Sequence, residues 1–477
     1  RCCTQNGIRG GSATVHFPIW HQEIEDIIVL KNNKGTEDNR VRKLDYSIQL
    51  SKLFYARFIA DGEISLFSPH DVPGLYDAFG TESFDELYEE YERSDVPRKT
   101  IKAQELILNL LKERAETGRI YIMNIDHCNS HSSFTDKVEM SNLCQEITLP
   151  TKPVQHIDDE NGEIALCILS AINIGKIRDV QDLETLCDLS VRSLDELIDF
   201  QRYPVKAAEL ATRARRSLGI GYIGLAHYLA KQGVKYDDPK AWKIVHDLTE
   251  SFQYYLIKSS VNLAKEKGAC EYSNRTKYSH GILPIDTYKK DIDEIVPNKL
   301  NHDWESLREE VKQYGIRNST LSAQMPSESS SVVSNATNGI EPPRGYLSIK
   351  KSKKGPLKQI VPSYNTLKNN YTLLWDMKGN TGYINVVAVM QKFFDQAISG
   401  NWSYNPQHFE GSEVPTSVMA QDLLTTYKYG WKTSYYQNTY DVKTDEVESD
   451  TQENQLDTLI EDIMSSDQEE VCESCAI

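Results

Sequence analysis

Short apolar runs alternate with longer amphipathic segments along most of this chain. The short runs have the length and composition of buried strands, and they lie at residues 13–17, 120–124, 143–149 and 163–174. The longer segments repeat apolar positions every three or four residues, as helices with one buried face do, and they lie at 19–30, 77–93, 102–117, 207–232 and 242–268. This alternation predicts an α/β fold with a mainly parallel sheet, and it leaves open whether the sheet is a barrel. The apolar stretch 383–390 fits either a strand or a buried helix.

The charge of the chain is concentrated at one end. The 477 residues carry 53 basic and 70 acidic side chains, a net charge of −17. Residues 441–477 hold 13 acidic side chains and 1 basic one, so this segment contributes −12 and residues 1–440 contribute −5. A negative chain is a poor match for nucleic acid. No apolar run approaches the ~18–20 residues of a membrane helix, and we identify no signal peptide. We therefore expect neither nucleic acid nor a membrane among the partners.

These differences predict a folded body at residues 1–440 and a flexible acidic tail at 441–477. The tail has no aromatic residue and few apolar ones, which is typical of a segment that stays unfolded. Such tails often only aid solubility, but this one ends in Cys472 and Cys475, a CxxC pair that would act as a mobile dithiol. Nine cysteines in a long acidic chain favour a reducing cytoplasm over a disulfide framework. A single CxxC pair lacks the four ligands of a typical zinc site, so we expect no metal.

Residues 141–146 combine an amide, a thiol and a carboxylate. If this segment is extended, Asn142, Cys144 and Glu146 point to the same side. Such a face suits a reactive thiol beside a hydrogen-bonding group and a general base. A nearby carboxylate disfavours the thiolate, which suits a sulfur that reacts as a radical. The simpler interpretation is a half-buried strand with an unreactive cysteine.

Four other motifs have a structural interpretation beside a functional one. Cys167 lies in an apolar run and would ordinarily be a buried core cysteine. Tyr435 and Tyr436 are adjacent tyrosines, which usually serve packing, although tyrosine also supports proton-coupled one-electron transfer. The hydroxyl-rich run 326–331 fits a plain helix cap or a phosphate site at a helix N-terminus. The glycines at 219–224 lack the spacing of a dinucleotide-binding loop, and we expect them to serve close helix packing.

Taken together, ordered motifs across essentially the whole chain resemble the large (alpha) subunit of class I, aerobic ribonucleotide reductases of bacteria and T4-like phages. The motifs are RGG at 9–11, LFSPHDVPGLY at 66–76, GRIY at 118–121, SNLC at 141–144, GIRN at 315–318, NATNGIEPPRG at 335–345 and YYQNT at 435–439. The resemblance implies the C-terminal portion of a ten-stranded α/β barrel, with Cys144 on a finger loop inside it. It also implies an oxidoreductase that converts ribonucleoside diphosphates to 2′-deoxyribonucleoside diphosphates for DNA synthesis by thiyl-radical chemistry.

The resemblance assigns roles to the residues at the centre of the molecule. Cys144 resembles the cysteine that becomes a transient thiyl radical and removes the ribose 3′ hydrogen. Glu146 would take the proton of the 3′-hydroxyl group, and Asn142 would hydrogen-bond the ribose hydroxyls. Cys167 resembles one member of the cysteine pair that supplies two electrons. The residues that match the loop binding the substrate diphosphate are Ser327, Glu328, Ser329 and Ser330.

Further roles concern radical delivery, re-reduction and regulation. Tyr435 and Tyr436 resemble a relay from a small (beta) subunit whose di-iron–tyrosyl centre supplies the radical, so this chain is expected to bind no cofactor itself. Cys472 and Cys475 resemble the tail dithiol that re-reduces the active-site disulfide and is then reduced by thioredoxin or glutaredoxin. A dimer of large subunits is also implied. The residues that match the loop reporting the dNTP or ATP effector to the substrate base are Gln5 and Arg9.

The match also departs from the family pattern. The family's other redox cysteine would lie upstream of Arg1, so Cys167 has no disulfide partner in this chain. We therefore expect a C-terminal part that cannot turn over without an N-terminal part, which is either a separate chain or lost by truncation. One alternative is a non-catalytic fragment that only binds the small subunit, although the central residues of the site are all retained. The other is a glycyl-radical relative, which would need a C-terminal glycine motif, and the last 60 residues hold only Gly430.

Overall fold

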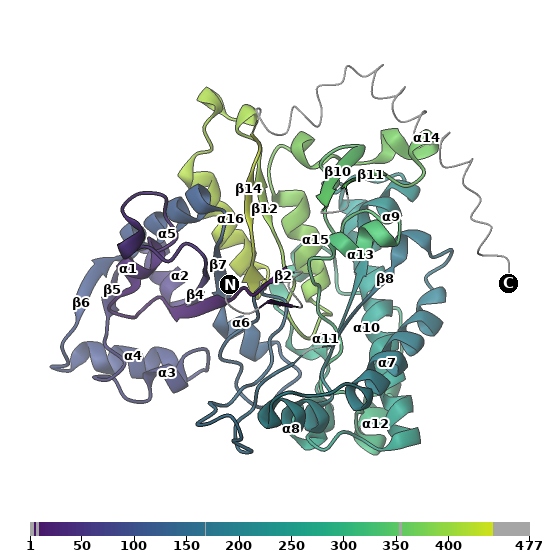
Figure 1. Cartoon of the computed structure of the whole chain (residues 1–477), viewed down its shortest axis with the longest axis horizontal. Helices are drawn as coiled ribbons and strands as arrows, with labels where there is room; N and C mark the ends of the chain where they lie inside the picture. Colours follow the sequence, from purple (N-terminus) through teal and green to yellow (C-terminus); the bar gives the residue numbers. More distant parts are fainter. Residues whose placement is uncertain (1–3, 6–8, 167, 353–354, 442–477) are drawn as a thin grey trace.

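The computed structural model describes residues 4–5, 9–166, 168–352 and 355–441 (Figure 1). Helices and strands alternate along these residues, which confirms the predicted α/β class. In the view of Figure 1 the purple and blue elements lie on the left and the teal helices on the right, with the yellow elements between them and part of the green elements above the teal helices. One continuous apolar cluster extends from Ile19 to Trp431 and joins these groups into a single core. None of the helices in the described ranges is long and apolar enough to cross a membrane.

A four-stranded sheet lies near the N-terminal end of the described chain. Its order is β13 (Thr433–Ser434), β7 (Ile120–Asn124), β4 (Asp45–Leu50) and β3 (Thr14–Pro18). The neighbours β3, β4 and β7 run parallel, and β13 pairs with β7 in the antiparallel direction. Every residue of β4 and β7 is buried, as expected for parallel strands covered on both faces. The runs 13–17 and 120–124 are therefore strands, as predicted.

A second parallel pair is formed by β8 (Ile168–Asn173) and β9 (Leu218–Ile223). Isolated parallel bridges extend this pair, from Ile220 to Ser322 and from Gln324 to Ile398. Gly221 allows this extension, because a Cβ atom there would lie 2.7 Å from the carbonyl oxygen of Ala323. The described strands form six sheets, none of which closes into a barrel. The two larger parallel strand groups, the four-stranded sheet and β8–β9 with its bridges, approach each other near residues 397–402, where Tyr435 N donates to Gly400 O at 2.7 Å.

The prediction of one helix over 207–232 is wrong. Two short helices, α8 (Lys206–Arg215) and α9 (Leu225–Lys231), flank strand β9 instead. The chain leaves α8 through Arg216 in the left-handed region, with φ 47°, and enters α9 through Gly224 with φ 81°. The glycines at 219–224 therefore serve a strand and a helix start, and the expected role in helix packing is also wrong.

The long helix predicted at 242–268 is α10 (Pro239–Lys267). Its start follows the sequence signals, because Asp238 accepts a hydrogen bond from Lys240 N and proline takes the first turn. α10 packs against α7 (Asp182–Phe200), α12 (Trp304–Tyr314) and α15 (Thr381–Gln391). The ambiguous stretch 383–390 lies in α15, and all its residues are buried, which explains why its pattern has no amphipathic period.

Helices on the left of Figure 1 correct two further predictions. The segment 77–93 is broken into α3 (Leu75–Ala78) and α4 (Phe84–Arg93), because Gly80 has φ 88° and packs against Ile125. The segment 19–30 contains only the short α1 (Ile24–Ile28). Its first residues, 19–23, form turns instead, and they are held by neighbouring strands, since Ile19 N donates to Gln49 O and Trp20 O accepts from Phe67 N.

The remaining elements complete the description. The other helices are α2 (Lys52–Ile59), α5 (Ala103–Thr117), α6 (Ile125–Ser130), α11 (Pro284–Thr287), α13 (Glu328–Val333), α14 (Tyr364–Leu367) and α16 (Thr416–Lys428). The other strands are β1 (Thr4–Gln5), β2 (Arg9–Gly10), β5 (Glu63–Leu66), β6 (Lys99–Lys102), β10 (Leu347–Ser352), β11 (Gly355–Ile360), β12 (Trp402–Tyr404) and β14 (Gln437–Thr439). The 3-10 turns are η1 (Glu37–Asn39), η2 (Ile174–Lys176), η3 (Ser273–Arg275), η4 (Tyr278–His280), η5 (Lys290–Glu294), η6 (Lys368–Asn370), η7 (Leu374–Asp376), η8 (Pro406–His408) and η9 (Glu410–Ser412).

Candidate active site

The segment around Cys144 is a loop with a tight turn. The prediction of a strand at 143–149 is wrong, because residues 143–145 form a turn in which Gln145 has φ 75°. Hydrogen bonds within the loop fix this shape, since Asn142 O accepts from Gln145 N at 3.4 Å and Asn142 Oδ1 accepts from Ile147 N at 3.2 Å. The alternation of an extended chain therefore does not explain how its polar residues come together.

Contacts from the four-stranded sheet hold one side of this loop. Gln145 is fully buried, and its Oε1 accepts from Ser47 Oγ of β4 at 2.8 Å. Its backbone carbonyl accepts from Thr433 Oγ1 of β13 at 2.9 Å. Thr14 Oγ1 of β3 donates to Leu143 O at 3.0 Å. Two strands of the same sheet, β4 and β13, thus stabilise the positive φ of Gln145.

The segment 396–399 holds the other side of the loop. Ala397 N donates to Glu146 O at 3.0 Å. The hydroxyl of Ser399 lies between the backbone and the carboxylate, 2.5 Å from Cys144 O and 3.1 Å from Glu146 Oε2. The loop that carries Cys144 therefore lies between the two parallel strand groups and contacts both.

The carboxylate of Glu146 lies in a dry environment. Its side chain is 2% exposed, and this burial raises its pKa. Hydrogen bonds from Asn142 and Ser399 oppose the shift because they stabilise the charged form. A raised pKa makes the carboxylate a stronger base, which suits a group that takes up a proton during a reaction. The turn thus brings Asn142, Cys144 and Glu146 together, as their sequence positions suggested, but by a different geometry.

The stacked side chains of Tyr435 and Tyr436 reach the sulfur of Cys144. The hydroxyl of Tyr435 donates to Cys144 Sγ at 3.4 Å. The rings of Tyr435 and Tyr436 stack with their centroids 3.8 Å apart, and Tyr121 lies 4.7 Å from Tyr435. Burial is the main cause that raises the pKa of Tyr435, with a contribution from Cys144. A continuous line of aromatic rings therefore reaches the thiol.

The backbone of the tyrosine pair is held by a buried guanidinium group. Arg114 of α5 is fully buried and donates to the carbonyl oxygens of Tyr435 at 2.7 Å and Tyr436 at 3.1 Å. Its guanidinium group also lies 4.7 Å from the ring of Trp402. Neither Arg114 nor Ser399 was identified from the sequence, because a single arginine in an amphipathic helix and a serine in a glycine-containing loop match no motif.

The predicted phosphate run begins a short helix. Ser327 is the N-cap residue of α13 and is 4% exposed, but its hydroxyl donates to Met325 O at 3.2 Å and does not cap the helix. The remaining residues of the run, which form the first turn, are Glu328, Ser329 and Ser330. Glu328 lies close enough to Glu341 that its charge contributes, after burial, to raising the pKa of Glu341.

Asn401 connects this helix start to the tyrosine pair. Its Nδ2 donates to Glu341 Oε1 at 2.6 Å, and its Oδ1 accepts from Tyr436 N at 2.9 Å. The run at 327–330 and the aromatic line therefore belong to one region of the molecule. The carboxylate–amide link between them is another feature that the sequence analysis missed.

Several predicted residues cannot be positioned. Cys167, Cys472 and Cys475 lie outside the described residues. Gln5 and Arg9 are backbone partners in the antiparallel pair of β1 and β2, and their side chains are not described.

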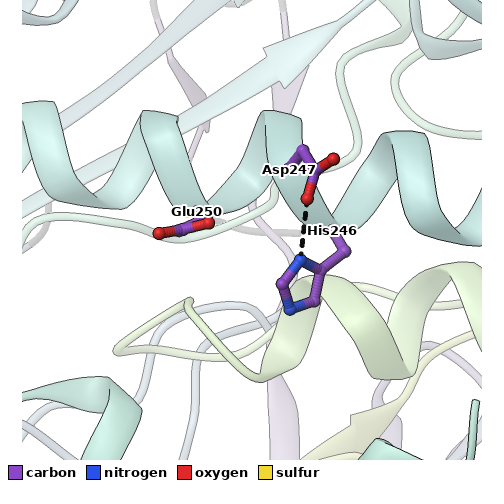
Figure 2. Close-up of side chains that lie close together, drawn as sticks. All are labelled: His246, Asp247 and Glu250. Atoms are coloured by element: carbon purple, nitrogen blue, oxygen red, sulfur yellow. Dashed lines mark hydrogen bonds and ion pairs between the residues drawn. The ribbon is translucent and has the colours of Figure 1, made fainter. Parts of the chain in front are cut away.

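One group of side chains could in principle ligate a metal. His246, Asp247 and Glu250 lie along α10, and each offers a ligand atom within 4.8 Å of the others (Figure 2). Glu250, however, already accepts hydrogen bonds from Asn301 N at 2.7 Å, His302 N at 3.0 Å and the Trp304 indole at 3.1 Å. The carboxylate therefore anchors the segment before α12, and the absence of a metal site stays a prediction.

Comparison with known proteins identifies the family. A family model described as "Ribonucleotide reductase, barrel domain" matches residues 1–437. The chain is 59% identical to a Haemophilus influenzae protein named ribonucleoside-diphosphate reductase subunit alpha, over 92% of this chain and 59% of that protein. It is 54% identical to an Escherichia coli K12 protein named ribonucleoside-diphosphate reductase 1 subunit alpha, over 100% of this chain and 62% of that protein. A phage T4 subunit alpha is 46% identical over 94% of this chain and 61% of its own length. The chain spans about three-fifths of these relatives, and it belongs to the ribonucleotide reductase barrel-domain family.

Proposed function

We propose that this chain is a catalytic part of the large subunit of a ribonucleoside-diphosphate reductase. It would reduce ribonucleoside diphosphates to 2′-deoxyribonucleoside diphosphates. The observation that carries the proposal is the stack of Tyr436 on Tyr435, whose hydroxyl donates to Cys144 Sγ at 3.4 Å. Relatives with the corresponding name support the same activity.

In the first step an oxidised Tyr435 takes a hydrogen atom from Cys144. The O–H bond of the tyrosine forms, the S–H bond breaks, and a thiyl radical remains on the sulfur. The hydrogen bond between these atoms supports the movement of proton and electron along one line. The raised pKa of Tyr435 favours the neutral phenol, so its proton moves with the electron. The radical itself would come from a di-iron–tyrosyl small subunit through Tyr436.

In the second step the thiyl radical removes the 3′ hydrogen of the ribose. Glu146 takes the proton of the 3′-hydroxyl group, and its raised pKa suits both this step and the return of the proton. Asn142 would bind the ribose hydroxyls while the 2′-hydroxyl leaves as water. Two electrons and two protons come from a cysteine pair that includes Cys167 and becomes a disulfide, and one of these protons leaves with the 2′-hydroxyl group as water. Cys144 then returns to the 3′ carbon the hydrogen atom that it took, which leaves the thiyl radical on its sulfur, and Tyr435 gives its hydrogen atom back to that sulfur.

The start of α13 would bind the substrate diphosphate. Backbone N–H groups and hydroxyls at a helix N-terminus suit an anion. The link from Glu341 through Asn401 to Tyr436 supports a location beside the radical path. The four residues proposed for this contact are Ser327, Glu328, Ser329 and Ser330.

The remaining parts of the proposal follow from the family. Residues 1–440 would belong to a ten-stranded barrel with Cys144 on its finger loop, and residues 441–477 would form a tail whose Cys472 and Cys475 re-reduce the disulfide. Partners would include a small subunit, thioredoxin or glutaredoxin in the cytoplasm, and a second large subunit. Gln5 and Arg9 would report dNTP or ATP effectors. An N-terminal part of the large subunit would supply the second member of the cysteine pair.

Substitution of Cys144 tests the proposal. The chain is combined with a small subunit, an effector, a dithiol and the N-terminal part of a related alpha subunit, and formation of deoxycytidine diphosphate is measured. Cys144→Ser should abolish product, whereas Cys270→Ser, at a buried cysteine, should retain it. Product formation by Cys144→Ser, or no product from the parent chain under any of these conditions, would refute the proposal. Turnover without the N-terminal part would contradict only the need for that part.

A further inference from the structure

Arg114 is a fully buried cation that no carboxylate neutralises within the described part of the chain. Its guanidinium group donates instead to three backbone carbonyl oxygens, those of Ile120, Tyr435 and Tyr436. Burial lowers its pKa to about 10, so the group keeps its charge at neutral pH. A buried charge without a counterion is costly, and a neutral donor could also bond these carbonyls. The positive charge therefore has a use beyond hydrogen bonding.

The charge lies over an oxidisable ring. The guanidinium carbon of Arg114 is 4.7 Å from the centre of the Trp402 ring. Trp402 is fully buried, and its indole Nε1–H has no hydrogen-bond partner among the described residues. The same residue adjoins the tyrosine pair, because Trp402 N donates to Tyr436 O at 2.9 Å. An indole thus lies beside the proposed radical path without belonging to it.

Oxidation of this indole would divert the radical. If Trp402 gave an electron to a radical on Tyr436, the phenol oxygen would take a proton from solvent and an indole radical cation would remain. That cation becomes neutral only when Nε1 releases its proton, and no acceptor for the proton lies within the described ranges. The radical on Trp402 would therefore stay positively charged, 4.7 Å from the charge of Arg114. Two positive charges at this distance repel each other strongly in a protein interior.

The tyrosines are affected much less by the same charge. A tyrosine loses its proton together with the electron, so its radical is neutral. The cation therefore discriminates between the two kinds of ring according to the charge of the oxidised product. Because Arg114 also donates to the carbonyl oxygens of Tyr435 and Tyr436, the pair itself fixes the guanidinium group near Trp402.

We propose that Arg114 confines the radical to the tyrosine pair by making Trp402 a poor electron donor. This inference rests on the proposed reductase function, since only a radical on Tyr436 needs such protection. Arg114 acts through the neighbouring indole and does not touch the reacting atoms. The simpler role, support of the backbone at Tyr435 and Tyr436 alone, predicts no dependence on Trp402.

Oxidation of the purified 477-residue chain by a photogenerated one-electron oxidant tests the effect without reductase activity. Mass spectrometry compares oxidised Trp402 with oxidised Trp20, another fully buried indole whose Nε1 has no partner in the described chain. Arg114→Gln removes the charge and keeps a donor for the carbonyls. It should raise the ratio of oxidised Trp402 to oxidised Trp20 about tenfold or more, as expected for a unit charge acting over 4.7 Å. Arg213→Gln, at a cation over the Tyr203 ring, should leave the ratio unchanged.

A double-mutant cycle in the assembled reductase tests the consequence for the radical. Paramagnetic resonance gives the amount of small-subunit radical lost for each deoxycytidine diphosphate formed. Arg114→Gln should raise this loss about tenfold. Trp402→Phe in the same chain should return the loss to the parent value, because the acceptor of the radical is gone. Trp402→Phe alone should change neither the loss nor the turnover.

Three results would overturn the proposal. The first is an unchanged ratio of oxidised Trp402 to oxidised Trp20 in folded Arg114→Gln. The second is a radical loss in Arg114→Gln that Trp402→Phe does not reverse, which would leave only backbone support. The third is an altered radical loss in Trp402→Phe alone, and this variant keeps Arg114, so it decides the matter even if Arg114→Gln does not fold. Absence of product from the parent chain would refute the proposed function, and the oxidation ratio would still decide whether Arg114 protects Trp402.

Discussion

Removal of the Ser399 hydroxyl should weaken the function of Glu146 without disrupting the fold. This hydroxyl lies 2.5 Å from Cys144 O and 3.1 Å from Glu146 Oε2, and it is the contact that ties the carboxylate to the segment opposite the loop. Ser399→Ala deletes only this hydroxyl. The backbone bond from Ala397 N to Glu146 O remains and keeps the loop in register.

The size of the effect follows from one shared hydrogen bond. A hydrogen bond to a charged group contributes about 1.5–3 kcal/mol. The single Oγ–H can point to only one of its two acceptors at a time, so we expect the lower end, about 1.5 kcal/mol. About 1.4 kcal/mol corresponds to a tenfold change in rate, so kcat/KM of Ser399→Ala should fall about tenfold. Loss of the donor also raises the pKa of Glu146 further, because one bond that stabilises its carboxylate is removed.

The pH dependence of deoxynucleotide formation separates this effect from a loss of stability. The base must be ionised, so activity declines as the pH falls through the pKa of Glu146, and in Ser399→Ala this decline should occur at a higher pH. The matched control is Ser260→Ala in α10, which deletes a buried hydroxyl that donates to Asn318 Oδ1 at 2.9 Å. The control should unfold more easily with an unchanged pH profile. An unshifted profile for Ser399→Ala, with activity lost only in proportion to unfolded protein, would refute the reasoning.

Three other predictions concern the radical path and the fold. Tyr435→Phe should abolish deoxynucleotide formation with unchanged circular dichroism, because it removes only the hydroxyl that reaches the thiol; retained turnover would contradict the relay. Gly221→Ala should lower the free energy of unfolding by about 1–3 kcal/mol, since its Cβ would lie 2.7 Å from Ala323 O, whereas Gly379→Ala, with open space around it, should change little. Burial lowers the pKa of Lys432 from 10.5 to about 7. Between these values the unfolded chain holds more protons at this position, so Lys432 makes stability rise with pH. Denaturant titrations between pH 7 and 8.5, below the ordinary pKa of the buried thiols, should therefore show a less positive slope of stability against pH in Lys432→Met than in the parent chain.

Local sequence signals were sufficient to predict an element where its residues carry both the apolar pattern and the residues that mark its ends. The start of α10 follows from Asp238 and Pro239, and β7 follows from four apolar residues in succession at 120–123. They were insufficient at 207–232, where α8, β9 and α9 have similar apolar spacing and differ only in the conformations of Arg216 and Gly224. The strand is selected by its pairing with β8, whose residues lie about fifty positions earlier, and no local pattern contains that contact.

The active-site geometry depends on contacts between distant segments to an even greater extent. Tyr435 and Cys144 are separated by 291 residues, and only the fold brings the hydroxyl to the sulfur. The turn at Gln145 requires Ser47 and Thr433 to stabilise a positive φ, so the local sequence indicated an extended segment instead. The chemical roles of these residues came from resemblance to a family, because residue types and spacing alone favoured an ordinary half-buried cysteine.

The anchoring of β14 has a mechanical consequence for the two tyrosines. β14 pairs with β12 directly after Tyr436, and Tyr440 N donates to Tyr404 O at 2.9 Å. The ring of Tyr440 also lies 5.4 Å from that of Trp375. A pull applied to the chain beyond Asp441 therefore loads this short parallel pair in shear before it reaches Tyr436. The β12–β14 pair therefore bears a force on the residues after Asp441 before that force can change how the rings of Tyr435 and Tyr436 align with the Cys144 thiol.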